Sequence, residues 1–317
     1  MSILYGKDIL RTDTLSDEEL ELILSTASRL ESVLKAGGRL TNMEGQILAT
    51  LFFEPSTRTR LSFETAMRRL GGQVITVADP KTSSAAKGES LADSMRTVEG
   101  YADVIVIRHP QKGSAQEAAD AVAVPVINAG DGTGQHPTQA LLDVYTIQKE
   151  KGSLEGPVLS GVEGLTMTLA GDLKNGRTAH SLVYLLARFG IRLLFVSPTE
   201  LKMPAEITAD LKKVGADVSE GSDLAAAMHQ SDVVYVTRIQ RERFEDPAEY
   251  ERLKGSYVVD MAMIRQAKPG ITIMHPLPRV DEIAPEVDTY EGAAYFRQAA
   301  NGVPIRMALL ALVTGRE

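Results

Sequence analysis

The sequence predicts an α/β protein with two doubly wound domains, each with a mainly parallel sheet flanked by helices, joined by interdomain helices. Short runs rich in Val, Ile and Leu alternate along the chain with amphipathic helical patterns. This order is typical of strand–helix–strand units with parallel strands. The length of 317 residues corresponds to about two domains. A stretch rich in Gly and Ser, residues 152–164, marks a connection near the middle of the chain, and its part 159–164 has no functional interpretation.

The first half begins with a helix, because the segment 14–19 combines hydroxyl and acidic residues just before an apolar periodic stretch, 20–34. Four apolar runs then predict strands at residues 46–53, 72–77, 104–107 and 124–128. Helices are expected between them, notably at 89–100. A Gly-rich loop at 128–134 leads into a further helix, 136–149, with Pro137 in its first turn.

The second half repeats the alternation. Strands are expected at residues 165–170, 191–196, 233–236 and 271–274, and helices at 177–189, 205–214 and 295–313. We therefore expect one domain at 1–138, completed by the C-terminal helix 294–317, and a second at 139–293. Right-handed crossovers would place the ligand clefts of both domains at the carboxyl ends of strands.

Composition excludes several classes of protein. The chain has no Cys, which excludes disulfides and thiolate chemistry, and its five His residues show no metal-binding spacing. A net charge of −8 with 5% aromatic residues and no Trp argues against nucleic-acid binding. No apolar run has the length of a membrane span, and residues 1–24 are mixed and acidic, without the apolar core of a signal peptide. We expect a cytoplasmic protein, or an organellar one whose targeting peptide has been removed.

The segment Phe52-Phe53-Glu54-Pro55-Ser56-Thr57-Arg58-Thr59-Arg60 is the most informative part of the chain. A buried strand ends here and a helix begins, so hydroxyls, guanidiniums and unpaired backbone amides gather at one helix N-terminus. Such a terminus favours an anion, and Arg adds charge-assisted hydrogen bonds. The segment therefore predicts a phosphate site. From these residues alone, a Ser N-cap followed by solvated arginines is the alternative.

Other polar side chains follow strands in the same way. Arg108 and Arg238 come at or after strand ends, and His136 and Gln139 lie one turn apart at a helix start. Each could be an ordinary surface or capping residue. The segment 171–178 nearly matches a phosphate-binding P-loop, but Arg177 stands in place of the Lys and no acidic Mg²⁺ ligand is evident.

Taken together, these motifs resemble those of the aspartate/ornithine carbamoyltransferase family. The blocks occur in the family's order over nearly the whole chain: Ser56 to Arg60, Ser83 to Glu89, Arg108-His109-Pro110, His136 to Gln139, Gly176-Arg177-Thr178, Thr237 to Gln240 and His275 to Arg279. The agreement of all of them makes a chance resemblance implausible.

The resemblance implies which residues act on carbamoyl phosphate. It implies a binding site made of Ser56, Thr57, Arg58, Thr59, Ser83, Lys87, Arg108, His136, Gln139, Leu277 and Pro278. Within it, the catalytic residues would be Arg58, Thr59, Lys87, Arg108 and His136. Ser83 and Lys87 would be donated by a neighbouring subunit, so the expected assembly is a homotrimer with shared active sites. The resemblance implies no metal and no organic cofactor.

The segment His275-Pro276-Leu277-Pro278 favours the aspartate branch of the family, because ornithine enzymes resemble it but carry Cys where Pro276 stands. The implied aspartate ligands are Lys87, Arg177, Thr178, Arg238, Gln240 and Leu277. The implied reaction makes N-carbamoyl-L-aspartate and phosphate from carbamoyl phosphate and L-aspartate, in pyrimidine biosynthesis. The alternatives are transfer to another amine such as ornithine, and a non-catalytic scaffold. A regulatory chain or a dihydroorotase is a possible partner.

Overall fold

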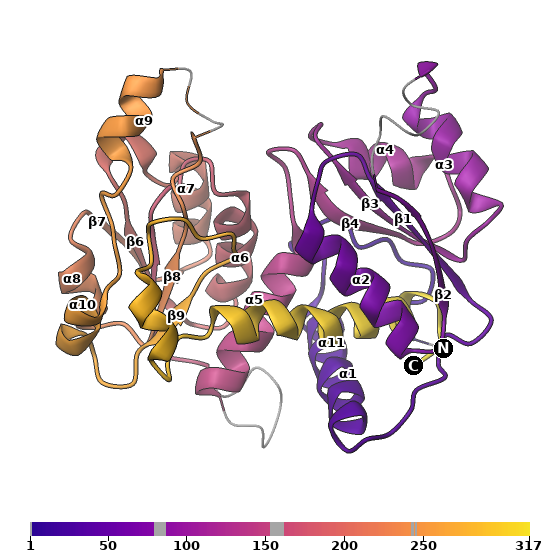
Figure 1. Ribbon diagram of the computed structural model, residues 1–317, viewed down its shortest axis with the longest axis horizontal. Coiled ribbons are helices and arrows are strands. Elements are labelled where there is room, and N and C mark those ends of the chain that lie inside the picture. Colours follow the sequence, from indigo (N-terminus) through magenta and orange to yellow (C-terminus); the bar gives the residue numbers. More distant parts are fainter. Residues whose placement is uncertain (1, 79–86, 153–161, 242–243, 245) are drawn as a thin grey trace. The chain divides into compact units, whose positions relative to one another are not determined.

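The computed structural model describes residues 2–78, 87–152, 162–241, 244 and 246–317. The chain divides into two compact units, one made of residues 1–142 and 300–317 and the other of residues 143–299. Each unit has one parallel sheet with helices packed against it (Figure 1). The helices α5 (Pro137–Lys151) and α11 (Tyr295–Val313) each include residues of both units. The expected division after residues 138 and 293 lies a few residues before these two boundaries.

The first unit has a four-stranded parallel sheet in the order β2-β1-β3-β4. Its strands are β1 (Ile47–Phe52), β2 (Gln73–Val77), β3 (Val104–His109) and β4 (Val126–Asp131). Its helices, besides parts of α5 and α11, are α1 (Asp17–Lys35), α2 (Thr57–Arg69), α3 (Leu91–Glu99) and α4 (Ser114–Asp120). The first helix begins as the sequence indicates, because Ser16 and Glu19 form a reciprocal capping box.

Right-handed crossovers explain how the helices of this unit cover both faces of its sheet. The chain moves in one direction from β1 to β2 and in the other from β2 to β3 and β4, so α2 lies on one face and α3 and α4 on the other (Figure 1). Alternate residues of β1 and β3 accordingly pack against α3 and α4. This core cluster contains Ala49, Leu51, Ile105, Ile107, Met95, Ala115 and Ala118.

The second unit has a five-stranded parallel sheet in the order β7-β6-β5-β8-β9. Its strands are β5 (Thr166–Ala170), β6 (Arg192–Val196), β7 (Val218–Gly221), β8 (Val233–Val236) and β9 (Thr272–Met274). Its helices are α6 (Arg177–Ala187), α7 (Ala205–Lys213), α8 (Leu224–Met228), α9 (Pro247–Leu253) and α10 (Met261–Gln266), with 3₁₀ turns at Thr199–Leu201 and Pro285–Thr289.

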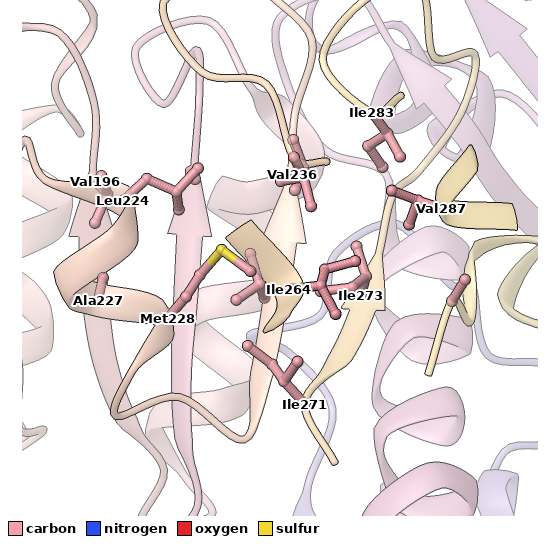
Figure 2. Close-up of a cluster of buried hydrophobic side chains, with 14 of the residues drawn as sticks. Val196, Leu224, Ala227, Met228, Val236, Ile264, Ile271, Ile273, Ile283 and Val287 are labelled. Carbon is pink, nitrogen blue, oxygen red and sulfur yellow. The ribbon is translucent and has the colours of Figure 1, made fainter. Parts of the chain in front are cut away.

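A continuous hydrophobic cluster fixes α8 and α10 against this sheet (Figure 2). Met228 of α8 and Ile264 of α10 pack among the β-branched side chains of the neighbouring strands, including Val236 and Ile273. At about 25 cal/mol per Å² of apolar surface removed from water, such burial holds the helices in place. Because the five strands are parallel, their carboxyl ends lie along one edge of the sheet.

The two-domain α/β fold predicted from the sequence is confirmed. Strand β8 and helix α11 begin and end at the expected residues, and most other elements differ by one to three residues at an end. Strand β7 and the short helices α8, α9 and α10 were missed. Among the described residues, the structure contains no helix with the length and hydropathy needed to span a bilayer.

Candidate active site

The strand order of each sheet identifies where a ligand would bind. In a doubly wound sheet, ligands bind at the carboxyl ends of the two strands between which the winding direction reverses. That point lies between β1 and β3 in the first unit and between β5 and β8 in the second. Arg108 is at the end of β3, Arg177 follows β5, and Arg238 follows β8. The arginines predicted to bind substrate thus lie at these two points.

The N-terminus of α2, next to the end of β1, is not capped by its own side chain. Ser56 occupies the N-cap position with φ −157° and ψ 99°, and its hydroxyl makes no capping hydrogen bond. The serines at the N-caps of α1 and α3, Ser16 and Ser90, both accept a hydrogen bond from the third helical residue. The first-turn amides of α2, where Thr59 is buried and Thr57 is exposed, are therefore available to an anion.

The two arginines of this helix start differ in their surroundings. Arg60 pairs with Glu64 one turn later at 3.3 Å, and Glu64 also pairs with Arg68 at 3.1 Å, which forms a ladder along the helix. Arg58 is exposed in the first turn, beside the amides that lack a side-chain cap. The pairing of Arg60 along the helix makes it the less suitable of the two for an anion, and the assignment of Arg58 to such a site stays a prediction.

Arg108 joins the ends of three strands of the first sheet. Its guanidinium lies 3.2 Å from the Glu54 carboxylate after β1, and its Nη1 donates to the Ala129 carbonyl of β4 at 3.1 Å. The Arg108 side chain is only 11% exposed. Glu54 thus orients Arg108 by an ion pair. A guanidinium held in this way can stabilise negative charge that develops on a bound carbonyl oxygen.

His136 is buried immediately before α5, and an anchored loop holds it there. Its carbonyl accepts the amide of Gln139 at 3.0 Å. In the loop before it, the Asp131 carboxylate accepts the backbone N–H groups of Gln135 at 2.6 Å and Gly113 at 2.9 Å. The sequence predicted a Gly-rich loop here but did not identify Asp131 as its anchor. The available signal in the sequence was an acidic residue, Asp131, two residues after Asn128-Ala129 at the end of a strand.

Three further residues of the first half are predicted to bind carbamoyl phosphate, namely Ser83, Lys87 and Gln139. Lys87 is exposed in a short turn before α3, and Gln139 is half-buried in the first turn of α5. Ser83 lies outside the described residues. No described group of three or more His, Cys, Asp or Glu side chains is arranged to hold a metal ion.

In the second unit, a tight turn after β5 presents the start of α6. Gly171 has φ +113°, and a Cβ atom there would lie 2.1 Å from the Thr237 carbonyl, so only glycine fits. The fully buried Asp172 carboxylate accepts the backbone N–H of Asn175 at 3.0 Å and its side-chain amide at 3.1 Å. Arg177 is then the first residue of α6, after Gly176, which provides no side-chain cap.

The segment after β8 is tied to this turn. The Thr237 hydroxyl donates to the Ala170 carbonyl at 3.1 Å, and Gln240 Nε2 donates to the Asn175 carbonyl at 3.3 Å. The segment carrying Arg238 and Gln240 is therefore held beside the one carrying Arg177. Two guanidiniums at one switch point suit the two carboxylates of a dicarboxylic ligand.

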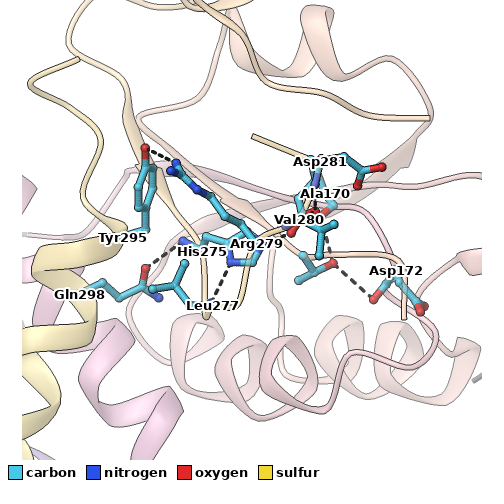
Figure 3. Close-up of polar contacts among 11 residues, drawn as sticks. Ala170, Asp172, His275, Leu277, Arg279, Val280, Asp281, Tyr295 and Gln298 are labelled. Atoms are coloured by element: carbon cyan, nitrogen blue, oxygen red, sulfur yellow. Dashed lines mark hydrogen bonds and ion pairs between the residues drawn. The ribbon is translucent and has the colours of Figure 1, made fainter. Parts of the chain in front are cut away.

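The segment after β9, whose polar contacts Figure 3 shows, has an unusual backbone. Leu277 has φ 55°, and it is the one residue other than glycine with positive φ in the described part of the chain. The Leu277–Pro278 peptide is cis. The Leu277 amide donates to His275 Nδ1 at 2.8 Å, and His275 Nε2 lies 2.6 Å from Glu282 Oε1.

Burial determines the charge of this pair. The pKa of His275 is lowered chiefly by burial, against the opposing hydrogen bond and charge of Glu282. Burial would raise the pKa of Glu282, but the hydrogen bond and charge of His275, with backbone N–H donors, lower it overall. We therefore describe the pair as a neutral imidazole donating to a carboxylate.

Comparison with known proteins agrees with this geometry. Residues 7–149 match the family model described as "Aspartate/ornithine carbamoyltransferase, carbamoyl-P binding domain", and residues 163–313 match "Aspartate/ornithine carbamoyltransferase, Asp/Orn binding domain". The chain is 54% identical over 310 residues to the aspartate carbamoyltransferase catalytic subunit of Thermococcus gammatolerans, covering 98% of each chain.

Two solved structures are also similar. One is the catalytic subunit of M. jannaschii aspartate transcarbamoylase, at 50% identity and a TM-score of 0.88, with 96% of this chain and 97% of that one covered. The other is aspartate transcarbamoylase from Trypanosoma cruzi in complex with carbamoyl phosphate and aspartate, at 41% identity and a TM-score of 0.91, with 98% of each chain covered. The chain belongs to the aspartate/ornithine carbamoyltransferase family.

Proposed function

We propose that this protein transfers the carbamoyl group of carbamoyl phosphate to the amine of L-aspartate. The products are N-carbamoyl-L-aspartate and phosphate, and the step belongs to de novo pyrimidine biosynthesis. The observation that carries the proposal is that Arg177 and Arg238 follow the two strands that flank one switch point, on segments joined by a hydrogen bond from Gln240 to Asn175. A dicarboxylic amine matches two guanidiniums, whereas the cationic side chain of ornithine would be repelled by them. The names of the similar proteins agree with this choice.

In this proposal the first unit binds carbamoyl phosphate. The phosphate accepts hydrogen bonds from the first-turn amides of α2 and from Ser56, Thr57 and Arg58. Thr59, Arg108 and His136 donate to the carbonyl oxygen, and Gln139 accepts from the carbamoyl NH₂. Because Glu54 and the Ala129 carbonyl already orient Arg108, little reorganisation is needed as charge develops on that oxygen.

The second unit binds aspartate, with Arg177, Thr178, Arg238 and Gln240 as carboxylate ligands. The Leu277 carbonyl accepts from the reacting nitrogen, and Pro278 closes the same loop. The neutral amine attacks the carbamoyl carbon to form a C–N bond and a tetrahedral intermediate. The bond from carbon to the phosphate oxygen then breaks, and the departing phosphate takes the proton that the amine loses. Positioning and charge stabilisation supply the rate enhancement.

We further propose a homotrimer in which Ser83 and Lys87 of one subunit complete the site of its neighbour. Lys87 is exposed in the single chain, which agrees with a role in the active site of a neighbouring subunit. Sedimentation should give the mass of three 34.3-kDa chains. Mixing inactive Lys87→Ala and Arg58→Ala proteins under subunit exchange should restore activity, because some sites in mixed trimers carry neither substitution. Absence of any recovery in verified mixed trimers would contradict shared sites.

Phosphate release from carbamoyl phosphate tests the function directly. The assay is run with L-aspartate, L-ornithine, putrescine or no acceptor. Turnover that requires aspartate and is abolished in Arg58→Ala supports the proposal, and Arg60→Ala is the matched control because Arg60 pairs within its own helix. Turnover with ornithine alone would contradict the assignment of the second substrate. No turnover with any acceptor would favour a non-catalytic scaffold.

A further inference from the structure

A buried chain of hydrogen bonds in the second unit connects Tyr235 on β8 to Gln298 in the first turn of α11. The Tyr235 hydroxyl donates to Asp143 Oδ2 at 2.9 Å, and Gln298 Nε2 donates to Asp143 Oδ1 at 2.7 Å. Tyr235, Asp143 and Gln298 are all at most 1% exposed. Because the carboxylate accepts on both oxygens, the orientation of the Gln298 amide is fixed.

The same chain continues to Leu277. Gln298 Oε1 accepts the backbone N–H of His275 at 2.8 Å, and His275 Nδ1 accepts the backbone N–H of Leu277 at 2.8 Å (Figure 3). A backbone N–H can only donate, so Nδ1 carries no proton. The proton of the neutral ring is therefore on Nε2, which donates to Glu282 Oε1 at 2.6 Å.

This tautomer matters because Leu277 is in a backbone conformation that leucine rarely adopts. Its φ of 55° lies in the left-handed region, where a side chain with Cβ is strained. Such a conformation persists only where the surroundings over-determine it. The bond from the Leu277 amide to His275 is a contact of the strained residue itself, and His275 is only 1% exposed.

We propose that His275 is a positioning residue for the reaction, which holds Leu277 in its left-handed conformation through Nδ1, and that Glu282 sets the required tautomer. The inference rests on the proposed function for its consequence in catalysis, because Leu277 is a ligand of the reacting nitrogen there. Its structural part, the Nε2–H tautomer bonded to the Leu277 amide, does not depend on that function. His275 itself touches no reacting atom in this account.

Two substitutions of His275 separate positioning from filling space. In His275→Asn the amide oxygen can take the place of Nδ1 and accept from Leu277, but nothing reaches Glu282. In His275→Gln the amide reaches Glu282, but nothing replaces Nδ1. Both variants bury one neutral amide of similar size. We expect His275→Asn to keep kcat/KM for aspartate within about fivefold of the wild type, and His275→Gln to lose roughly 100-fold, as for a misplaced ligand of the reacting group.

Glu282→Gln tests the role of the carboxylate without changing its shape. Oε2 of Glu282 accepts the backbone N–H groups of Val280 and Asp281, both at 3.1 Å. In the variant the amide oxygen takes that place, so the NH₂ group faces His275 Nε2. The ring must then accept at Nε2 and carry its proton on Nδ1, where it opposes the Leu277 N–H. We expect a loss of about 10- to 100-fold in kcat/KM for aspartate.

The tautomer is read directly from ¹⁵N chemical shifts of the five His residues, with His275 assigned by its absence in His275→Asn. The expected spectrum is the Nε2–H tautomer in the wild type and the Nδ1–H tautomer in Glu282→Gln. The proposed site for inorganic phosphate lies in the first unit, and the substituted residues lie in the second. Phosphate binding should therefore be unchanged in every variant that retains the wild-type melting temperature. This control separates lost positioning from unfolding.

An Nδ1–H tautomer in the wild type would overturn the proposal, and so would equal loss of activity in His275→Asn and His275→Gln. If the wild type fails to use aspartate, the proposed function is wrong, and the ¹⁵N spectrum still decides the tautomer. If the His275 variants do not fold, His275 is assigned by replacing the other four His residues one at a time, and the wild-type and Glu282→Gln spectra then decide the tautomer.

Discussion

Asp131 should be essential for the loop that carries His136. Its carboxylate accepts two backbone amides, those of Gln135 and Gly113, and the side chain is only 7% exposed. Asp131→Ala leaves both amides without this acceptor. At about 1–3 kcal/mol for each unsatisfied buried donor, the loss for two donors is about 2–6 kcal/mol in the free energy of unfolding. Asp131→Asn keeps one acceptor oxygen and should lose about half as much.

These free energies translate into melting temperatures. For a unit of this size, 1 kcal/mol corresponds to about 2–4 °C, so Asp131→Ala should lower the melting temperature of the first unit by roughly 4–24 °C, measured by scanning calorimetry. Because His136 follows the loop directly, kcat for phosphate release should fall by up to about 100-fold in the Asn variant at a temperature where it is folded.

The control is Asp13→Asn, whose carboxylate pairs with Arg11 at the surface. Both side chains of that pair are about half exposed, so the substitution should change stability by less than about 1 kcal/mol. The reasoning fails if Asp131→Asn melts within 1 °C of the wild type with full kcat, or if the two asparagine variants behave alike.

Three further predictions follow. Burial lowers the pKa values of three histidines below the ordinary 6.5, so the folded state binds fewer protons than the unfolded state. The melting temperature should therefore fall as the pH drops below about 6.5. It should level off once the pH is below the pKa values of these histidines in the folded state. These are His109, His180 and His275. Gly171→Ala should destabilise the second unit by more than about 2 kcal/mol, because its Cβ would lie 2.1 Å from the Thr237 carbonyl, whereas Gly190→Ala, with open space around it, should cost about 1 kcal/mol in a denaturation series. Arg177→Ala should raise KM for aspartate at least tenfold without changing phosphate affinity, since its ligand is a carboxylate, and equal weakening of both would contradict the division of roles.

The sequence predicted the sheets well because their signals are local. A buried parallel strand is a continuous apolar run, so the segments of β1, β5 and β8 were placed within one residue. Strand β7, Val218–Gly221, escaped because it is a four-residue edge strand with three exposed residues and no apolar run. The short helices failed for a similar reason, since five to seven residues carry too little periodicity to be seen.

The site was predicted at the level of ligand-facing groups but not of the groups that support them. Each motif lies at a strand end, where strand and turn patterns are visible in the sequence. The partners of these motifs are remote: Gln298 and Asp143 are 155 positions apart, and Tyr235 and Asp143 are 92 apart. No pattern in a single sequence couples such positions, because only the folded sheet brings them together. The left-handed Leu277 is invisible for the same reason.

The two proposed anion sites share one structural basis. In each, a parallel sheet reverses its winding direction, and a helix begins at that point without a side-chain cap, at Ser56 for α2 and at Gly176 for α6. A serine could cap, as Ser16 and Ser90 do elsewhere in the chain, so the uncapped state of α2 reflects its backbone conformation and not its residue type. An uncapped terminus costs stability that a bound anion restores. Ligand binding should therefore stabilise each unit separately: phosphate should protect the α2 amides from hydrogen exchange, and a dicarboxylate such as succinate should protect those of α6. Protection of both helices by phosphate alone, at concentrations that saturate only one site, would show that the two anion sites are not independent.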